Sequence, residues 1–504
     1  MLDTLLARGA PAILEAMPQI HPALLSPWTP RLAAAGLAVL AVASGIDAPL
    51  VEDSLFWWVP KALMAVEEGP RTAYAHALPA TVAAGLTPST TPPQWSAGLP
   101  DYAHPTVWYL WLAGWLKVSQ TVTMVHLACI LPAALAAVGF VEVGGRLGNR
   151  WAGLIPLCMP PVLAQMLRPE LDLPLLAITP WALLAVLDGR WRAFAVLGFL
   201  APWMKEPGAL LVVPAALRAL RERRWEPRVL APVLGLAAWG FLHGGLAQPE
   251  RLPVTLLEWL RKDLWVALRI VLIEQGRWML LLAIPFTWRR WRRGPAAGLT
   301  GALVGIWIVA FATVGFFATR GAADLHTHVR YFLPGMALAG VLLGVRAPWL
   351  ALPGLLWLHA SSPFGPEASR FGTDAGRAEK ASAPWIQARL EDGETVWVGS
   401  YQAAGLTQPW AGIVETPQAG FRIYAMDTAP QQVSIGDLVI VAAYGEPAGR
   451  LERGLVWERT EQWTVRDATV SAYRVTGFRP DATPPDRTGF PSSAPVPPAS
   501  PVLR

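Results

Sequence analysis

The sequence predicts a polytopic α-helical membrane protein with a small α/β domain near its C-terminal end. Of the 504 residues, 53% are hydrophobic and only 15% are charged, and the mean hydropathy is +0.36. Apolar segments of roughly 15 to 22 residues recur along the chain, and helices of that length cross a hydrocarbon core of ~30 Å. This balance is not that of a soluble enzyme.

Arginine-rich links between the apolar segments predict the orientation in the membrane. Links of this kind face the cytoplasm, and they occur at residues 144–150, 188–192, 218–228, 289–293 and 346. Their alternation with the intervening links predicts about eleven spans in a cell inner (plasma) membrane, with a cytoplasmic N-terminus and an external C-terminal domain. The net charge of +5 arises from these links, so it does not indicate a nucleic-acid partner.

The same pattern divides the chain into successive parts. We expect a cytoplasmic N-terminal segment, a transmembrane domain that includes a first external loop, an extracytoplasmic α/β domain and a disordered Pro-rich tail. These parts cover residues 1–31, 32–360 (the loop at 47–104), 361–478 and 479–504. No uninterrupted apolar core follows a basic stretch at the N-terminus, so we predict no cleavable signal peptide. The two cysteines, Cys129 and Cys158, lie in apolar segments and are expected to be packing residues.

Two helices are expected to lie in the membrane interface instead of crossing. The segment from Val107 to Val118 is too short to span and carries several tryptophans, which favour the interface. From Pro253 to Ile270, charged and apolar residues segregate at helical spacing. The following span is expected from Val122 to Val143, and the first span from Leu32 to Ser44.

Beyond residue 361 the pattern changes to that of a water-soluble domain. The segments TVWVGSY, DLVIVAAYG, GLVWERTEQWTV and ATVSAYRV alternate or run apolar between Gly, Pro and Asp. Such segments are typical of strands, and they predict the sheet of the α/β domain.

Two adjacent acids, Glu52 and Asp53, follow the first span and precede an aromatic stretch, in VEDSLFWWVPKAL. A carboxylate held at the membrane surface is partly desolvated, which raises its pKa and lets it accept a proton from a hydroxyl. The alternative is a solvated helix start, where acids are favoured by the helix dipole.

Further charged residues recur in the links that are expected to be external. Asp101 and His104 precede one helix, Arg168, Glu170 and Asp172 stand between two spans, and Lys205 starts another segment; a last group contains Arg320, Asp324, His326, His328, Arg330 and Tyr331. Each alone is more often a snorkelling or capping residue. Together they predict one external cavity, whose cations suit the phosphate of a lipid-linked substrate.

These segments, in order, resemble the GT-C superfamily of integral-membrane glycosyltransferases, in particular the protein O-mannosyltransferases and the lipid A aminoarabinose transferases. The resemblance covers about residues 30–350 and is carried by VEDSLFWWVPKALMAVEEG, AHPTVWYLWL, GGRLGNRWAGL, RPELDLPLL, MKEPGALLVVPAAL and VRYFLPGMAL. No single motif is specific; the ordered set carries the likeness. The chain departs from the family in the order Glu52-Asp53 and in Thr106, where a second proline is common.

The resemblance implies a reaction. A sugar on a polyprenyl phosphate would be transferred, with inversion, to a hydroxyl of a polymer, lipid or protein, and membrane lipids would surround the enzyme. Asp53 would be the general base, favoured over Glu52 by its spacing to Phe56, Trp57 and Gly69. The phosphate would be held by Lys205 and by Arg320 or Arg330, and Asp172 and His104 would orient hydroxyls. Asp101, Arg168 and Tyr331 complete the expected substrate-binding set.

Other interpretations stay open at this level. His326 and His328 with Asp324 could bind a divalent metal, although such a pair is more often a polar loop. A transporter or flippase for a lipid-linked or anionic substrate would use the same cations, but it would need polar residues at the midplane. A non-catalytic assembly subunit of the same superfamily is a third reading, and the sequence does not identify the sugar or the acceptor.

Overall fold

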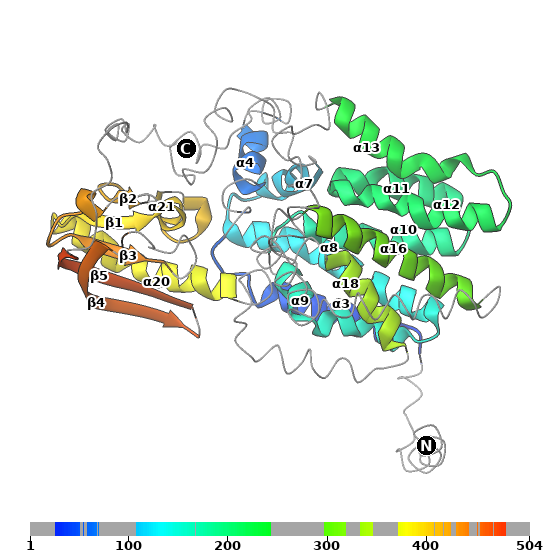
Figure 1. Ribbon diagram of the computed structural model, residues 1–504, viewed down its shortest axis with the longest axis horizontal. Helices are drawn as coiled ribbons and strands as arrows, with labels where there is room; N and C mark the ends of the chain where they lie inside the picture. Colours follow the sequence, from blue (N-terminus) through cyan, green and yellow to red (C-terminus); the bar gives the residue numbers. More distant parts are fainter. Residues whose placement is uncertain are drawn as a thin grey trace, which may run out of the picture.

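The computed structural model consists of a helical bundle with an α/β domain at one end of it (Figure 1). The structure describes residues 26–50, 54, 58–67, 69, 107–166, 168–242, 297–318, 333–345, 371–407, 409–416, 418–424, 430–442, 451, 454–466 and 468–479. The predicted interfacial helix at 253–270 and the predicted tail from residue 480 onward lie outside these ranges.

The described part of the bundle is built from α-helices and short 3-10 helices. These are α3 (Trp28–Ala43), α4 (Val59–Glu67), α7 (Val107–Leu116), α8 (Val122–Leu147), η3 (Arg150–Cys158), α9 (Pro160–Met166), α10 (Asp172–Leu187), α11 (Trp191–Met204), η4 (Glu206–Leu211), α12 (Val212–Arg221), η5 (Pro227–Leu230), α13 (Ala231–Leu242), α16 (Ala297–Ala318) and α18 (Leu333–Gly344). The helices predicted at 107–118 and 122–143 are indeed separate, as α7 and α8.

By length and composition, α8 is the one helix among the described residues that could cross a membrane. Shorter apolar helices, of 10–17 residues, include α3, α10 and α18. Between α8 and α10 the chain forms η3 and α9 instead of one long helix, because Pro156, Pro160 and Pro161 each lack a backbone N–H donor. The predicted count of about eleven spans depends also on residues outside the described ranges.

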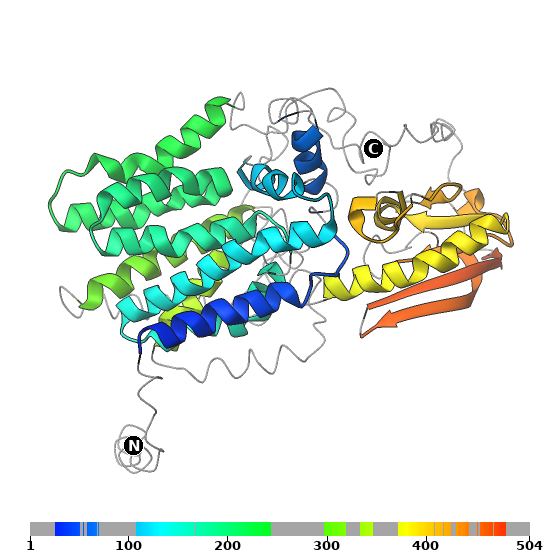
Figure 2. The ribbon, with the colours of Figure 1, turned by 180° about the vertical axis from the view of Figure 1, so that it is seen from behind.

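The two ends of the bundle carry different sets of ion pairs. At one end, which we name the arginine end, Asp188 after α10 accepts a hydrogen bond from Arg146 at 3.0 Å and forms an ion pair with Arg190 at 3.6 Å. Arg31 near the start of α3 pairs with Glu142 of α8. We name the opposite end the domain end, because α3 runs toward the α/β domain there (Figure 2). Both α8 and α10 begin at the domain end.

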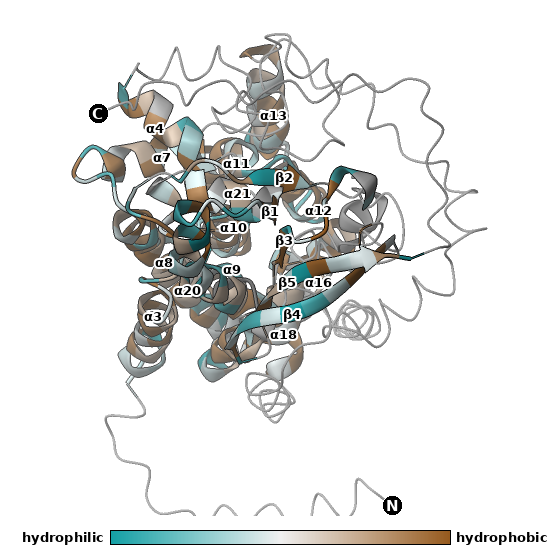
Figure 3. Cartoon of the chain, turned by 90° about the vertical axis from the view of Figure 1, so that its left-hand side faces the viewer, coloured by the Kyte–Doolittle hydropathy of each residue, from teal (hydrophilic) through white to brown (hydrophobic). Residues whose placement is uncertain are grey.

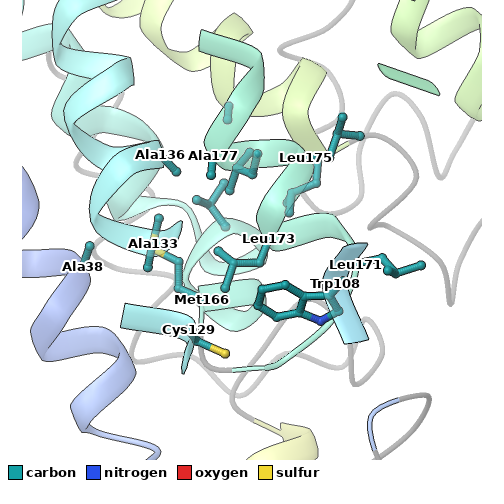
Figure 4. Close-up of a cluster of buried hydrophobic side chains, with 14 of the residues drawn as sticks. Ala38, Trp108, Cys129, Ala133, Ala136, Met166, Leu171, Leu173, Leu175 and Ala177 are labelled. Atoms are coloured by element: carbon teal, nitrogen blue, oxygen red, sulfur yellow. The ribbon is translucent and has the colours of Figure 1, made fainter. Parts of the chain in front are cut away.

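Small residues and a few large ones fill the core of the bundle. Figure 4 shows Ala133 and Ala136 of α8 beside Met166, Leu173 and Trp108, and these side chains are buried. Alanines let helices approach closely, so van der Waals contact can hold them together even where lipid surrounds them. Cys129 is completely buried in this cluster, and both cysteines are free, in agreement with their expected packing role.

The α/β domain contains one sheet with strand order β2-β1-β3-β5-β4. Its elements are α20 (Phe371–Glu391), β1 (Val396–Gly399), α21 (Ser400–Thr407), η11 (Pro409–Ala411), β2 (Arg422–Tyr424), η12 (Pro430–Gln432), β3 (Leu438–Val441), β4 (Leu455–Val465) and β5 (Ala468–Phe478). β1 pairs in parallel with β2 and β3, and β5 is antiparallel to β3 and β4. Much of β4 is hydrophilic (Figure 3). Strands β1, β3, β4 and β5 are the four predicted from the sequence.

Candidate functional site

A short turn before α10, residues 168–172, brings three ionisable side chains to the domain end of the bundle. Arg168, Glu170 and Asp172 are only 1–2% exposed. A buried charge is costly unless it is paired or hydrogen-bonded. The partners of these three side chains therefore show which segments of the chain meet at this turn.

Glu170 binds the segment that follows the first helix of the bundle. Its Oε1 accepts the backbone N–H of Ser54 at 3.2 Å and the Ser54 hydroxyl at 2.7 Å. Its Oε2 accepts the indole N–H of Trp58 at 2.9 Å. The carboxylate therefore fixes both Ser54 and the start of α4 against the turn.

Asp172, the first residue of α10, pairs with Lys205 where α11 ends. The distance from Lys205 Nζ to Asp172 Oδ1 is 2.5 Å, and both residues are buried. α11 ends at Met204, and the backbone of the next residue, Lys205, is extended. Pro207 follows in η4, and Gly208 lies so close to the α11 backbone that a Cβ there would be 2.4 Å from the carbonyl carbon of Ala201. This close return of the chain turns Lys205 toward α10.

A third buried cation, Lys61, lies on α4, three residues after the Trp58 that donates to Glu170. Lys61 is 3% exposed, and its Nζ lies 5.7 Å from the centre of the Tyr109 ring on α7. Trp108, which precedes Tyr109, anchors α7 to the turn. Its indole N–H donates to the carbonyl oxygen of Pro169 at 2.8 Å. α4, α7 and the turn thus form one packed unit.

The side chain of Gln165, near the end of α9, is buried and unpaired among the described residues. Its side chain is 0% exposed, and neither Nε2 nor Oε1 makes a hydrogen bond with any described residue. Its backbone carbonyl accepts the N–H of Arg168 at 3.4 Å, so it belongs to the same turn. A buried amide with unused donors and acceptors is unusual in a protein interior, and it suits a site for a polar ligand.

The structure brings together some of the residues predicted from the sequence. Asp172 and Lys205 are in contact, and Arg168 lies in the same turn. The remaining predicted residues lie outside the described ranges: Glu52, Asp53, Asp101, His104, Arg320, Asp324, His326, His328, Arg330 and Tyr331. Within the described part of the chain, no group of three or more His, Cys, Asp or Glu residues is arranged to hold a metal ion.

Sequence reasoning missed four contributors to this site. Ser54 and Trp58 were not recognised as partners of Glu170, and Lys61 was not recognised as a buried cation. For Lys61 a signal existed, because a lone lysine within an apolar helix is costly and therefore indicates a functional or paired group. For Gln165 no comparable signal exists in the sequence.

Comparison with solved structures gives two chains that resemble this one. Both are crystal structures of ArnT from Cupriavidus metallidurans, one bound to undecaprenyl phosphate and one in the apo state. Each aligns over 88% of this chain and 97% of that chain at 13% sequence identity, with TM-scores of 0.46 and 0.47. No family model and no curated protein matches the sequence. With identity this low, the likeness does not say which reaction the chain performs.

Proposed function

We propose that this protein is a membrane glycosyltransferase that moves a sugar from a polyprenyl-phosphate donor to an acceptor hydroxyl, with inversion at the anomeric carbon. One observation carries the proposal. Glu170, which lies in the turn that leads to the buried Asp172–Lys205 pair, accepts a hydrogen bond from Ser54. Ser54 directly follows Asp53, the proposed base. The segment with the acid is therefore tied to the part of the bundle that carries the cations.

The cations of the site supply the binding energy for a phosphate. Among the described residues of this end, the buried cations Lys61, Arg168 and Lys205 outnumber the buried carboxylates Glu170 and Asp172. A phosphate that enters could accept charge-assisted hydrogen bonds from these cations. We propose that Arg320 or Arg330 joins them, as the resemblance of VRYFLPGMAL to the family implies.

The proposed reaction needs one base and a stabilised leaving group. Asp53 takes the proton of the acceptor hydroxyl, and its oxygen attacks the anomeric carbon as the bond from that carbon to the phosphate oxygen breaks. The negative charge then resides on the lipid phosphate, where Lys205, Lys61 and Arg168 stabilise it in a site that excludes water. Attack opposite to the leaving group gives inversion.

The arginines at the opposite end of the bundle support an external site. The arginine end carries Arg146 and Arg190, and arginine-rich ends face the cytoplasm. The domain end, with Glu170, Asp172 and Lys205, then faces outward, together with the α/β domain. A lipid-linked sugar in the outer leaflet would reach the site directly, and the protein would reside in the inner (plasma) membrane.

The test is transfer from radiolabelled polyprenyl-phosphate sugars by the purified full-length protein. Asp53→Asn is expected to lower kcat by about 100-fold or more, because the general base is lost. Lys205→Met is expected to lower both donor binding and kcat. Asp188→Asn is the matched control, since Asp188 ends the same helix that Asp172 begins but pairs with Arg146 at the arginine end.

The results separate the possible functions. Full activity of Asp53→Asn and of Glu52→Gln would contradict the assignment of the base. Binding of the lipid donor by the wild-type protein without any transfer would favour a transporter or a non-catalytic subunit. Equal losses in Asp188→Asn and Lys205→Met would show that the assay reports folding and not the site.

A further inference from the structure

We propose that the α/β domain positions the segment that carries the proposed base, by holding residues 44–50 from outside the bundle. This inference rests on the proposed function. Residues 44–50 connect the end of α3 to Ser54, and the contacts of both the bundle and the α/β domain converge on them. Ala48 and Leu50 within this segment are buried, at 3% and 2% exposure.

The α/β domain holds this segment through two separate elements. From α20, Arg377 Nη2 donates to the carbonyl oxygen of Ser44 at 3.1 Å and to Asp47 Oδ1 at 2.7 Å. From η11, the carbonyl oxygen of Ala411 accepts the backbone N–H of Leu50 at 3.0 Å. Both ends of the segment are therefore bound to the same domain.

Helix α8 of the bundle contacts the same segment from the other side. His126 of α8 donates from Nε2 to the carbonyl oxygen of Ala48 at 2.9 Å. Gly412, with φ +74°, follows η11 and lies against the start of α8, where a Cβ would be 2.9 Å from Val122 Cγ2. Only a glycine fits both that backbone conformation and that contact without strain. The 44–50 segment is thus enclosed by α8, α20 and η11.

Arg377 is itself fixed within the α/β domain. Asp374, which is 5% exposed, lies 3.5 Å from Arg377 Nη1 and 3.7 Å from Arg466 Nη1. Because a buried carboxylate aligns the guanidinium, the side chain loses less conformational entropy on binding Asp47 than a freely rotating arginine would.

The chain between the two fixed points is short. Leu50 is bound to Ala411 and Ser54 is bound to Glu170, and the intervening chain can extend at most ~14 Å. A short chain fixed at both ends has few conformations, so two fixed ends at Leu50 and Ser54 are the means by which the α/β domain would position the base. Release of the Leu50 end would leave the segment fixed only at Ser54. Small displacements of a catalytic group cost much of the rate, so kcat depends on this contact.

The experiment compares Arg377→Gln and Asp47→Asn with the wild-type full-length protein. Two quantities are measured: hydrogen exchange of backbone amides in residues 44–58, and kcat with KM for a radiolabelled polyprenyl-phosphate sugar. We expect faster exchange in this segment and a kcat about tenfold lower, with the KM for the lipid donor unchanged. Asp47 is an exposed side chain, so Asp47→Asn tests the contact without threatening the fold. Arg377→Lys keeps the charge and is expected to restore most of kcat.

Arg389→Gln is the matched control. Arg389 lies on the same helix, α20, but its ion pairs with Asp392 and Glu394 stay inside the α/β domain. This variant is expected to change neither the exchange of residues 44–58 nor kcat.

Three results would overturn the inference: unchanged exchange in Arg377→Gln, unchanged kcat, or a change in KM alone. If the wild-type protein transfers no sugar, the proposed function fails, but the exchange measurement still decides whether the α/β domain holds this segment. Faster exchange in both variants then supports the contact, and unchanged exchange rejects it.

Discussion

Ser54 donates both its backbone N–H and its hydroxyl to one oxygen of Glu170, although 116 residues separate the two in sequence. The other oxygen of that carboxylate accepts the indole of Trp58. Glu170 is 1% exposed, so these three donors take the place of water around its charge. The contact joins the residue after Asp53 to the turn that precedes the Asp172–Lys205 pair, and it therefore defines the geometry of the proposed site.

Replacement of Glu170 by glutamine is expected to destabilise the protein despite its similar shape. The glutamine NH₂ group must face either the backbone N–H of Ser54 or the indole N–H of Trp58, so one buried donor meets another donor. The expected loss is about 1–3 kcal/mol, measured by denaturant unfolding in detergent, together with loss of sugar transfer. Glu222→Gln is the control, because Glu222 pairs with Arg218 on a more exposed surface and should cost about 0.5 kcal/mol or less. Equal losses in the two variants would contradict the role given to Glu170.

Removal of the carboxylate from the Asp172–Lys205 pair is expected to cost more than removal of both charges. Asp172→Asn leaves the buried ammonium of Lys205 without this carboxylate, and the expected loss of stability is about 3–5 kcal/mol. The double variant Asp172→Asn, Lys205→Met should recover much of that loss, but it should not recover sugar transfer. Urea unfolding of both variants measures the first effect. If the double variant regains sugar transfer along with stability, Lys205 does not bind the donor phosphate.

Much of the secondary structure followed from local patterns in the sequence. The apolar run in DLVIVAAYG and the alternation in ATVSAYRV marked β3 and β5, and the apolar run after Thr121 marked α8. β2 escaped prediction because it has only three residues, Arg422–Tyr424, too few for a period to appear. α20 was not predicted either, although its alanines, glutamates, arginines and lysine are strong helix formers.

The site could be predicted only in part, for a physical reason. Charges at the ends of apolar segments indicated Arg168, Asp172 and Lys205, because ionisable groups are costly deeper in a span. Which of them pair is decided by the packing of α4, α7, α10 and α11, and no local pattern encodes that packing. The contact of Asp47 with Arg377 belongs to the same class, since its partners are 330 residues apart.

The Asp47–Arg377 contact predicts a pH dependence at low pH. The hydrogen bond from Arg377, assisted by Lys380, holds the pKa of the Asp47 carboxyl below its usual range. A group with a lowered pKa in the folded state stabilises the fold above its unfolded pKa of about 3.9, and this contribution is lost as the pH falls through the lowered value. The difference in melting temperature between wild type and Asp47→Asn should therefore be constant from about pH 5 to 8, begin to fall near pH 4, and vanish only below the lowered pKa of Asp47. A difference that grows as the pH falls would contradict this pairing.

Gln165 provides a test that separates a binding residue from a structural one. Its buried amide makes no hydrogen bond with the described residues, so Gln165→Met removes a desolvated polar group at nearly constant volume and should leave stability unchanged or raise it by up to about 1 kcal/mol. If the amide binds a hydroxyl or phosphate oxygen of the donor, the same variant should raise the KM for that donor by about tenfold. Gln402→Met is the control: Gln402 is equally buried, but its Nε2 donates to Ser382 Oγ at 3.0 Å inside the α/β domain. That variant should lose stability and keep its KM, whereas a Gln165→Met protein that melts lower and binds the donor normally would make Gln165 a structural residue.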